Sequence, residues 1–356
     1  MSRFTIDEVS IPRTIDSPDA ADFVATVEVR NAVEADGFGT EDLSYSAADL
    51  LPGWLNTVYE PKRLFAARVD GRIVARAIYE TAIEDADVVW LGVQVLPQFR
   101  RLGIGTALSE LLETMAAEDN RRKIIVYTVS KEAPGERVAA PTGFGSVPRD
   151  GTEVRFLLSR GYTLEQVERG SRLALPLDDE DLRGRLDVAA VAAGTDYSLH
   201  FWMNRTPERW RDDLAVLLTR MSTDAPTAGL EEPEDPWTAE RVLDEERRRE
   251  SSPRTALTTA VEHVPSGRLV GFTELNAPAE LDRPVEQGDT LVLKEHRGHR
   301  LGTLLKVANL LALQSELPGH PAVITFNAEE NRHMLDVNEA VGFLPIGYEG
   351  AWKKVL

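Results

Sequence analysis

The residues best suited to chemistry form a short loop, Arg100-Arg101-Leu102-Gly103-Ile104-Gly105. An apolar run from Val88 to Val95 precedes this loop, and apolar residues at helical spacing follow it. The loop is therefore predicted to join a strand to a helix. Glycines leave backbone N–H groups uncovered, and such groups at a helix N-terminus attract anions. Because two arginines add positive charge, this sequence pattern predicts that the loop binds a phosphate-bearing ligand.

Two common nucleotide-binding loops do not fit this sequence. A P-loop ends in Gly-Lys followed by Ser or Thr, and no such ending follows Gly105. A Rossmann loop has a third glycine, and that position holds Leu108. The phosphate-bearing ligand is therefore expected to be one that neither a P-loop nor a Rossmann loop binds.

A second copy of the loop, Arg297-Gly298-His299-Arg300-Leu301-Gly302, lies in the second half of the chain. It also follows a strand-like run and precedes a helical pattern. The ends of the two halves match as well, because Gly161 is followed seven residues later by Glu168, and Gly342 by Glu349. We infer an internal duplication.

The order of elements is the same in both halves. Each half is predicted to run from a strand through helices to a hairpin, with Asp70-Gly71 as the first turn and Pro265-Ser266-Gly267 as the second. The stretch Leu164 to Leu175 is predicted to be the strand that closes the first half. Residues 222–236 are rich in proline and acidic residues, and form either a substrate lid or a plain surface connection.

This order of elements, with the loop pattern Arg-x-x-Gly-x-Gly, resembles the GNAT superfamily of N-acetyltransferases. The resemblance covers nearly the whole chain. It implies an α/β protein with two tandem GNAT folds, each a mixed, mostly antiparallel central sheet flanked by helices. The expected boundaries are an N-terminal domain at 1–177, a linker at 178–194 and a C-terminal domain at 195–356.

Composition narrows the classes of partner. The formal net charge of −19 disfavours nucleic acid and anionic membranes. The chain has no cysteine, so it has neither disulfides nor thiolate chemistry. His296, His299 and His333 lack metal-ligand spacing, so no metal is expected. There is no apolar core of a signal peptide and no run long enough to span a membrane, which predicts a cytoplasmic enzyme.

In the family the loop holds the pyrophosphate of coenzyme A, and the backbone of the preceding strand holds the pantetheine arm. The resemblance thus implies acetyl-CoA as cosubstrate. The implied cofactor-binding residues of the first half are Val93, Val95, Arg100, Arg101, Gly103, Gly105 and Thr106. Those of the second half are Val292, Arg297, Gly298, His299, Arg300, Gly302, Thr303, Asn327 and Asn331.

Two of these second-half positions have alternative interpretations. Arg300 stands where the first glycine of the motif belongs, so its side chain either crowds the loop or pairs with a phosphate. Asn327 either contributes to the cofactor site or caps the helix after it.

The resemblance also suggests a general base. Histone-type members carry a glutamate eleven residues before the loop, and here that position is Glu286 in the second half but Val89 in the first. Glu286 is therefore the first candidate base, with a solvated loop position as the alternative, and Glu274 is the second candidate. This difference favours the C-terminal domain as the catalytic one.

The usual acid of the family is missing from both halves. A tyrosine that protonates the leaving thiolate would follow Asn331 by seven residues, and that position holds Asn338, which can offer only a hydrogen bond. The matching first-half position is Leu157. Unless another tyrosine, such as Tyr348, replaces it, we expect transfer without a tyrosine acid.

The sequence thus predicts an acyl-CoA-dependent N-acetyltransferase that acts by direct attack of an amine in a ternary complex. The alternatives are a CoA-binding regulatory module without turnover, or activity in the N-terminal domain. The expected partner is a small-molecule amine. The protein is expected to be a monomer with a pseudo-dimeric pair of domains, or a homodimer.

Overall fold

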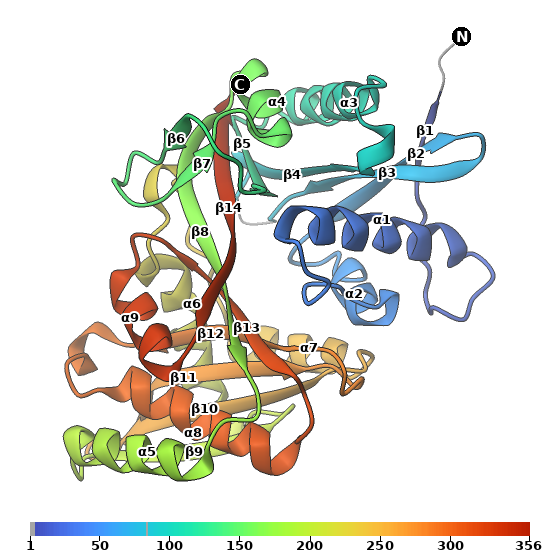
Figure 1. Cartoon of the computed structure of the whole chain (residues 1–356). Helices are drawn as coiled ribbons and strands as arrows, with labels where there is room; N and C mark the ends of the chain where they lie inside the picture. The colour runs from blue at the N-terminus through green and yellow to red at the C-terminus, as the bar shows by residue number, and fades with distance from the viewer. Residues whose placement is uncertain (1–3, 83–84) are drawn as a thin grey trace.

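The computed structural model describes residues 4–82 and 85–356 (Figure 1). Its strands are β1 (Thr5–Glu8), β2 (Lys62–Val69), β3 (Arg72–Glu80), β4 (Val88–Val95), β5 (Lys123–Val129), β6 (Arg137–Ala139), β7 (Ser146–Pro148), β8 (Thr163–Ala174), β9 (Tyr197–Met203), β10 (Thr255–His263), β11 (Arg268–Ala277), β12 (Val285–Val292), β13 (Ala322–Ala328) and β14 (Leu344–Val355). Its helices are α1 (Ala21–Phe38), α2 (Ala47–Trp54), α3 (Ile104–Glu118), α4 (Thr152–Ser159), α5 (Asp179–Ala193), α6 (Arg211–Asp224), α7 (Ala239–Arg249), α8 (Leu301–Glu316) and α9 (Arg332–Val341). Short 3-10 turns are η1 (Pro97–Phe99), η2 (Glu208–Trp210), η3 (Ala228–Leu230) and η4 (Lys294–His296).

The main sheet has twelve strands in the order β1-β2-β3-β4-β5-β14-β8-β13-β12-β11-β10-β9. Read inward from either edge, this order is the same for the two halves of the chain. Its pairs are antiparallel except β4 with β5 and β12 with β13, which are parallel. The mixed, mostly antiparallel sheet that the sequence predicts for each half is confirmed.

The closing strands are exchanged between the halves, which corrects one expectation. The stretch predicted to close the first half forms β8, but in the described sheet β8 pairs with β13 and β14 of the second half. The place beside β5 is taken by β14. The sequence pattern misses this exchange because alternation along a strand reports which face is buried, not which strand lies alongside.

Helices cover both faces of the sheet in each half. In Figure 1, α3 and α4 lie on the outer face of the first half, whereas α1 and α2 lie on the inner face, toward the second half. In the second half, α5 and α8 lie on the outer face, and α7 lies on the inner side, where it contacts α2. The inner faces of the two halves therefore look toward each other.

The predicted linker, residues 178–194, contains a helix. Residues 179–193 form α5, whose first turn is capped by the Asp178 carboxylate, which accepts from the Asp181 backbone N–H at 2.8 Å. Leu182 and Ala189 of α5 are buried, and the helix packs along α8. The segment is thus part of the second half's outer layer.

Residues 225–236, here called the strap, cross from the second half onto the sheet of the first. Leu230 is fully buried in an apolar cluster with Val88 and Ile125. The Tyr127 hydroxyl donates to Glu232 at 2.9 Å. Because a buried leucine anchors it, the strap is a structural contact between the halves.

The first half makes the converse contact. Leu43, in the loop after α1, is buried with Ile324 of β13 and packs near Phe326. Asp42 accepts from Arg172 of β8 at 2.8 Å. Each half therefore extends the loop after its first long helix over its neighbour.

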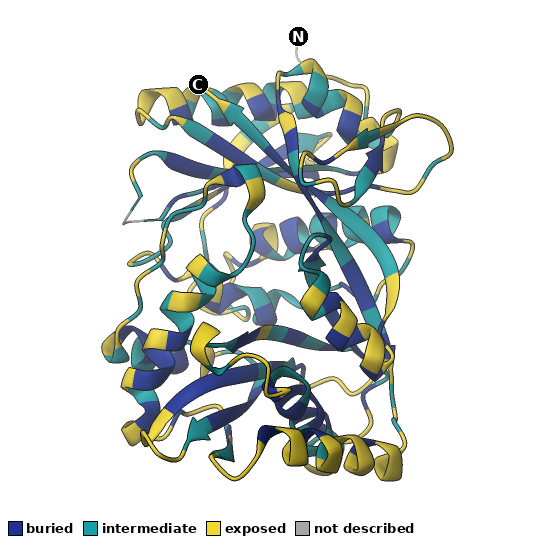
Figure 2. Ribbon diagram, turned by 90° about the vertical axis from the view of Figure 1, so that its left-hand side faces the viewer, coloured by how far each residue is buried: buried dark blue, intermediate teal, exposed yellow. Residues whose placement is uncertain are grey.

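Burial follows these layers. Figure 2 shows buried residues along the strands and on the helix faces against them, and exposed residues along the outer sides of the helices. Within residues 4–82 and 85–356, no helix combines the length and apolar character needed to cross a membrane.

Replacement of Leu230 by alanine tests the strap. The variant should lower the free energy of unfolding by about 2–5 kcal/mol, because it leaves a cavity in a fully buried cluster. The matched control is Val191→Ala on α5, whose side chain is 84% exposed, and which should change the free energy by about 0.5 kcal/mol or less. Urea denaturation measures both, and equal effects would show that the strap is not anchored.

Candidate functional site

The two predicted loops have the same internal anchor. Arg100 donates through Nε to the carbonyl of Val95 at 3.2 Å and through Nη1 to Asp36 at 3.1 Å. Arg297 repeats this with Val292 at 3.0 Å and Asp224 at 2.8 Å. These two arginines, expected to bind the cofactor, hold the loop to the end of the first long helix of their half.

The loops also share a backbone conformation in which the second and fourth residues are left-handed. In the first loop these are Arg101 (φ 65°) and Gly103 (φ 84°), and in the second Gly298 (φ 91°) and Arg300 (φ 54°). The glycine has thus changed places between the copies. Arg300 adopts the turn in spite of its side chain, at a cost of about 1–2 kcal/mol, so the second loop keeps its shape.

Both loops end at a helix N-terminus that has no side-chain cap. Gly103 precedes α3 and Arg300 precedes α8, and neither position carries a capping hydrogen bond. Among the described residues, the exposed guanidinium groups of Arg101 and Arg300 make no ion pair. Free N–H groups beside an unpaired cation fit a phosphate group. Thr106 and Thr303 lie in the first turns of these helices.

The parallel strands diverge toward the loops. β4 pairs with β5 only from Val88 to Trp90, and β12 pairs with β13 only at Val285 and Glu286. The strand positions predicted to bind through their backbone, Val93, Val95 and Val292, lie beyond these pairs. The backbone groups of Val93 on that side are therefore available to an extended ligand between the strands, whereas the carbonyls of Val95 and Val292 already accept from Arg100 and Arg297.

In the first half, this gap belongs to a cavity of about 1220 Å³. On the outer side it is lined by the loop and the start of α3, including Arg101, Gly105 and Thr106. On the inner side it is lined by α1 and by β14, including Glu34 and Glu349. The cavity thus connects the loop predicted to bind an anion on one face of the sheet to carboxylates on the other.

Glu349 is the carboxylate whose environment differs most from water. Burial, followed by the nearby charges of Glu34 and Glu168, raises the pKa of Glu349 to about 8. In the sheet, Glu349 lies directly opposite Glu168 on β8 and Val129 on β5. Burial with the charges of Glu232 and Glu330 raises the pKa of Glu168 to about 7.

The sequence contained a signal for this pair that was used only for the duplication. Glu168 and Glu349 are the matched glutamates that follow Gly161 and Gly342. Two glutamates in the middle of two buried strands face each other across the sheet, where like charges are unfavourable. Glutamates at such positions are not ordinary solvent-exposed surface charges, which indicates a functional role.

The tyrosines of the cavity donate their hydroxyls to carboxylates. The Tyr162 hydroxyl donates to Glu113 at 3.1 Å and that of Tyr127 to Glu232 at 2.9 Å. Burial and these carboxylates raise the pKa of both tyrosines. Tyr348, the tyrosine named as a replacement acid, is not among the residues that line this cavity.

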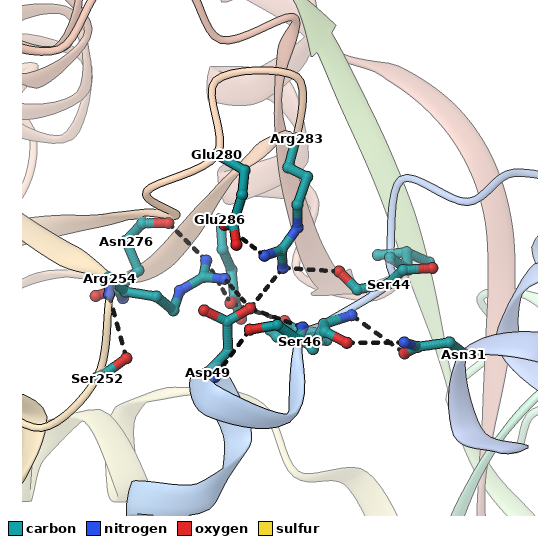
Figure 3. Close-up of polar contacts among 12 residues, drawn as sticks. Asn31, Ser44, Ser46, Asp49, Ser252, Arg254, Asn276, Glu280, Arg283 and Glu286 are labelled. Atoms are coloured by element: carbon teal, nitrogen blue, oxygen red, sulfur yellow. Dashed lines mark hydrogen bonds and ion pairs between the residues drawn. The ribbon is translucent and has the colours of Figure 1, made fainter. Parts of the chain in front are cut away.

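Glu286, the predicted base, lies in a different place. It is the second residue of β12, at the contact between the halves, where its carboxylate accepts from the Tyr45 hydroxyl at 2.8 Å and lies 3.5 Å from the Arg254 guanidinium. Figure 3 shows it beside Asp49 and Arg283 of the same polar network. A separate cavity of about 680 Å³, which the second loop does not line, contains Glu286.

The other second-half candidates are engaged with protein groups. Glu274 accepts from Arg249 at 2.9 Å. Asn338 is 1% exposed and donates to Asn327 at 2.6 Å. Asn331, not Asn327, caps α9, so the capping alternative for Asn327 is wrong. His299 lies in ring contact with Tyr197 at the edge of the second half.

The second half is filled where the first has its cavity. Six residues before Arg100 and Arg297 stand Gln94 and Leu291, and their partners on the adjacent strands are Arg76 and Phe272. Leu291 and Phe272 are buried in an apolar core under α6, whereas Gln94 and Arg76 line the first-half cavity.

A comparison with protein families matches the part of the chain that contains the first loop. Residues 29–144, which contain the first loop, match the model of the acetyltransferase (GNAT) family. No sequence among curated proteins matches the chain.

Solved structures share the fold over the full length. A tandem GNAT protein from the clavulanic acid biosynthesis pathway has a TM-score of 0.72 at 22% identity, covering 99% of this chain and 98% of that one. A GCN5-related N-acetyltransferase from Sphaerobacter thermophilus has a TM-score of 0.63 at 16% identity, covering 100% and 96%. The family match over residues 29–144 identifies a GNAT domain in the first half, and the shared architecture shows two GNAT folds in tandem over the whole chain.

Proposed function

We propose that the protein transfers the acetyl group of acetyl-CoA to an amine, and that transfer takes place in the cavity of the first half. One observation carries this assignment. The cavity joins the uncapped N-terminus of α3 on the outer face to the carboxyl group of Glu349 on the inner face, through the gap between β4 and β5. A donor with phosphates at one end and a thioester at the other fits such a path.

The outer end of the cavity would hold the phosphates. Arg101 supplies an unpaired cation, and the N–H groups of Gly105 and Thr106 are free at the helix start. Arg100 maintains the loop through its bonds to Val95 and Asp36. The backbone of β4 beyond Trp90 is open toward β5 and would align the pantetheine arm.

At the inner end Glu349 would act as general base. A base works best when its pKa is near the operating pH, and the pKa of about 8 meets this condition. Glu349 takes the proton of the ammonium group, and the amine attacks the thioester carbon. The C–N bond forms, the C–S bond breaks, and coenzyme A leaves as the thiolate. The second proton, which the nitrogen loses as the amide forms, passes to the thiolate through solvent. A thiol has a pKa of roughly 8.5, so its thiolate leaves at neutral pH without an obligatory acid.

This proposal places catalysis in the first half, whereas the spacing of Glu286 from its loop had favoured the second half. Support comes from Phe272 and Leu291, whose apolar core fills the region of the second half that corresponds to the first-half cavity. Glu286 and Glu274 stay the second assignment, for a reaction centred on the second loop.

The base is tested by parallel substitutions in the two halves. Glu349→Gln should lower kcat by ~10²–10⁴-fold with little change in the KM for acetyl-CoA, because only proton transfer is lost. Glu286→Gln should retain most of the activity. Thiol release from acetyl-CoA with an amine panel measures both. The reverse result would move catalysis to the second half, and no thiol release with any amine would favour a regulatory module.

The pH dependence of kcat/KM tests whether the charge of Glu168 raises the pKa of the proposed base, Glu349. The charge of Glu168 raises the pKa of Glu349, so Glu168→Gln should lower it. The rising limb of the profile should then move to lower pH by roughly 0.5–1 unit. Glu180→Gln removes an exposed charge on α5 and should leave the limb in place. A limb unmoved by Glu168→Gln would contradict the assignment of Glu349.

Calorimetric titration with coenzyme A tests the loops. A Cβ at Gly105 would lie 3.7 Å from Val95 and 3.9 Å from Phe156, an ordinary contact directed into the cavity. Gly105→Val should therefore fold and lose the first-half site. The matched Gly302→Val, at a position with no atom within 4 Å of a Cβ, should remove only binding at the second loop. Unchanged binding in Gly105→Val would exclude the first loop.

A further inference from the structure

Arg76 of β3 is a buried cation that makes no hydrogen bond and no ion pair with the described residues. It is 5% exposed, its Nε has no hydrogen-bond partner, and within the described residues its guanidinium makes no ion pair. It lines the same cavity as Glu349. An arginine taken out of water needs an anion or acceptors beside it, because otherwise its desolvation is uncompensated.

The nearby carboxylate of Glu34 acts on Arg76 through its charge but forms no ion pair with it. Gln94, directly opposite on β4, donates to Glu34 at 2.6 Å, and its own Oε1 is buried without a partner. The Glu34 carboxylate thus accepts from the amide of Gln94, but it does not form an ion pair with the Arg76 guanidinium. Arg30, one turn earlier on α1, is engaged by the carbonyl of Leu43 at 2.8 Å. An unpaired donor atom and an unpaired acceptor atom therefore belong to two neighbouring side chains that line the cavity.

The fold itself does not require these polar groups. The positions equivalent to Arg76 and Gln94 in the second half hold Phe272 and Leu291, which pack in an apolar core. The same scaffold is thus built with apolar residues at both positions. The polar pair is confined to the half with the large cavity, which indicates that it contacts a ligand.

We propose that Arg76 binds a carboxylate of the acetyl acceptor, so that the acceptor is an amino acid or another amine that carries a carboxylate. This rests on the proposed function of the first-half cavity. The guanidinium fork matches a carboxylate through two parallel hydrogen bonds. Arg76 and Gln94 lie on the inner side with α1, as does Glu349. The acceptor's ammonium group would lie by Glu349 and its carboxylate by Arg76.

The first experiment compares matched acceptors. Amino acids with the amino group at the α, β, γ or δ position are assayed by thiol release from acetyl-CoA, each beside its carboxamide. The wild-type protein should prefer the carboxylate in at least one pair by about 10²-fold or more in kcat/KM. Equal rates within every pair would overturn the role of Arg76 while leaving acetyl transfer intact.

The second experiment alters the cation. Arg76→Gln should lower kcat/KM for the carboxylate by roughly 10²-fold or more and hardly change that for the carboxamide. Arg76→Lys should recover part of the loss, because it restores charge without the fork. Arg72→Gln, at an exposed position on the same strand, is the control. Equal loss for both acceptors would indicate a structural role and contradict the proposal.

Two further measurements distinguish a failure of the acceptor proposal from a failure of the proposed function. If Arg76→Gln instead lost transfer from succinyl-CoA to an uncharged amine, Arg76 would recognise the donor, and the acceptor proposal would be wrong. If no amine were acetylated, the proposed function would fail. Calorimetry of the same amino acids with the CoA-saturated protein would then decide on Arg76, since binding lost in Arg76→Gln supports a carboxylate site and binding unchanged refutes it.

Discussion

The pairing of β8 with β14 is the interaction on which the rest of the structure depends. Each of these strands belongs by sequence to one half and by hydrogen bonding to the sheet of the other. Their antiparallel pairing joins two sheets into one of twelve strands. Neither half can complete its sheet without the other, so the two folds form a single structural unit.

The exchange also determines what surrounds the candidate site. Because β14 lies beside β5, the first-half cavity receives Glu349 from the far end of the chain. Glu168 faces it from β8, and the strap of the second half brings Glu232 to Tyr127. The group of carboxylates around Glu349 and Glu168 is therefore assembled from both halves.

The duplicated halves have diverged in what fills the space under their first long helix. Arg100 and Arg297 hold their loops through equivalent bonds, and the left-handed turns coincide although the glycines do not. The loop is thus retained as a shape in both halves. In contrast, Arg76 is replaced by Phe272, so a polar cavity corresponds to an apolar core. This difference, rather than the loops, distinguishes the halves.

The sequence by itself determined the fold of each half, its repetition, and the two loops that are predicted to bind anions. These features depend on local order, namely apolar periodicity, glycine positions and charges a few residues apart. Only the tertiary structure decided which strand completes which sheet, and which carboxylates share a cavity. Glu286 has the expected spacing from its loop but is engaged by Tyr45 and Arg254, whereas Glu349 reaches the first-half cavity through strand exchange. Spacing along the chain fixes a residue's place on its strand. The groups around its side chain come from segments hundreds of residues away, and no local pattern specifies them.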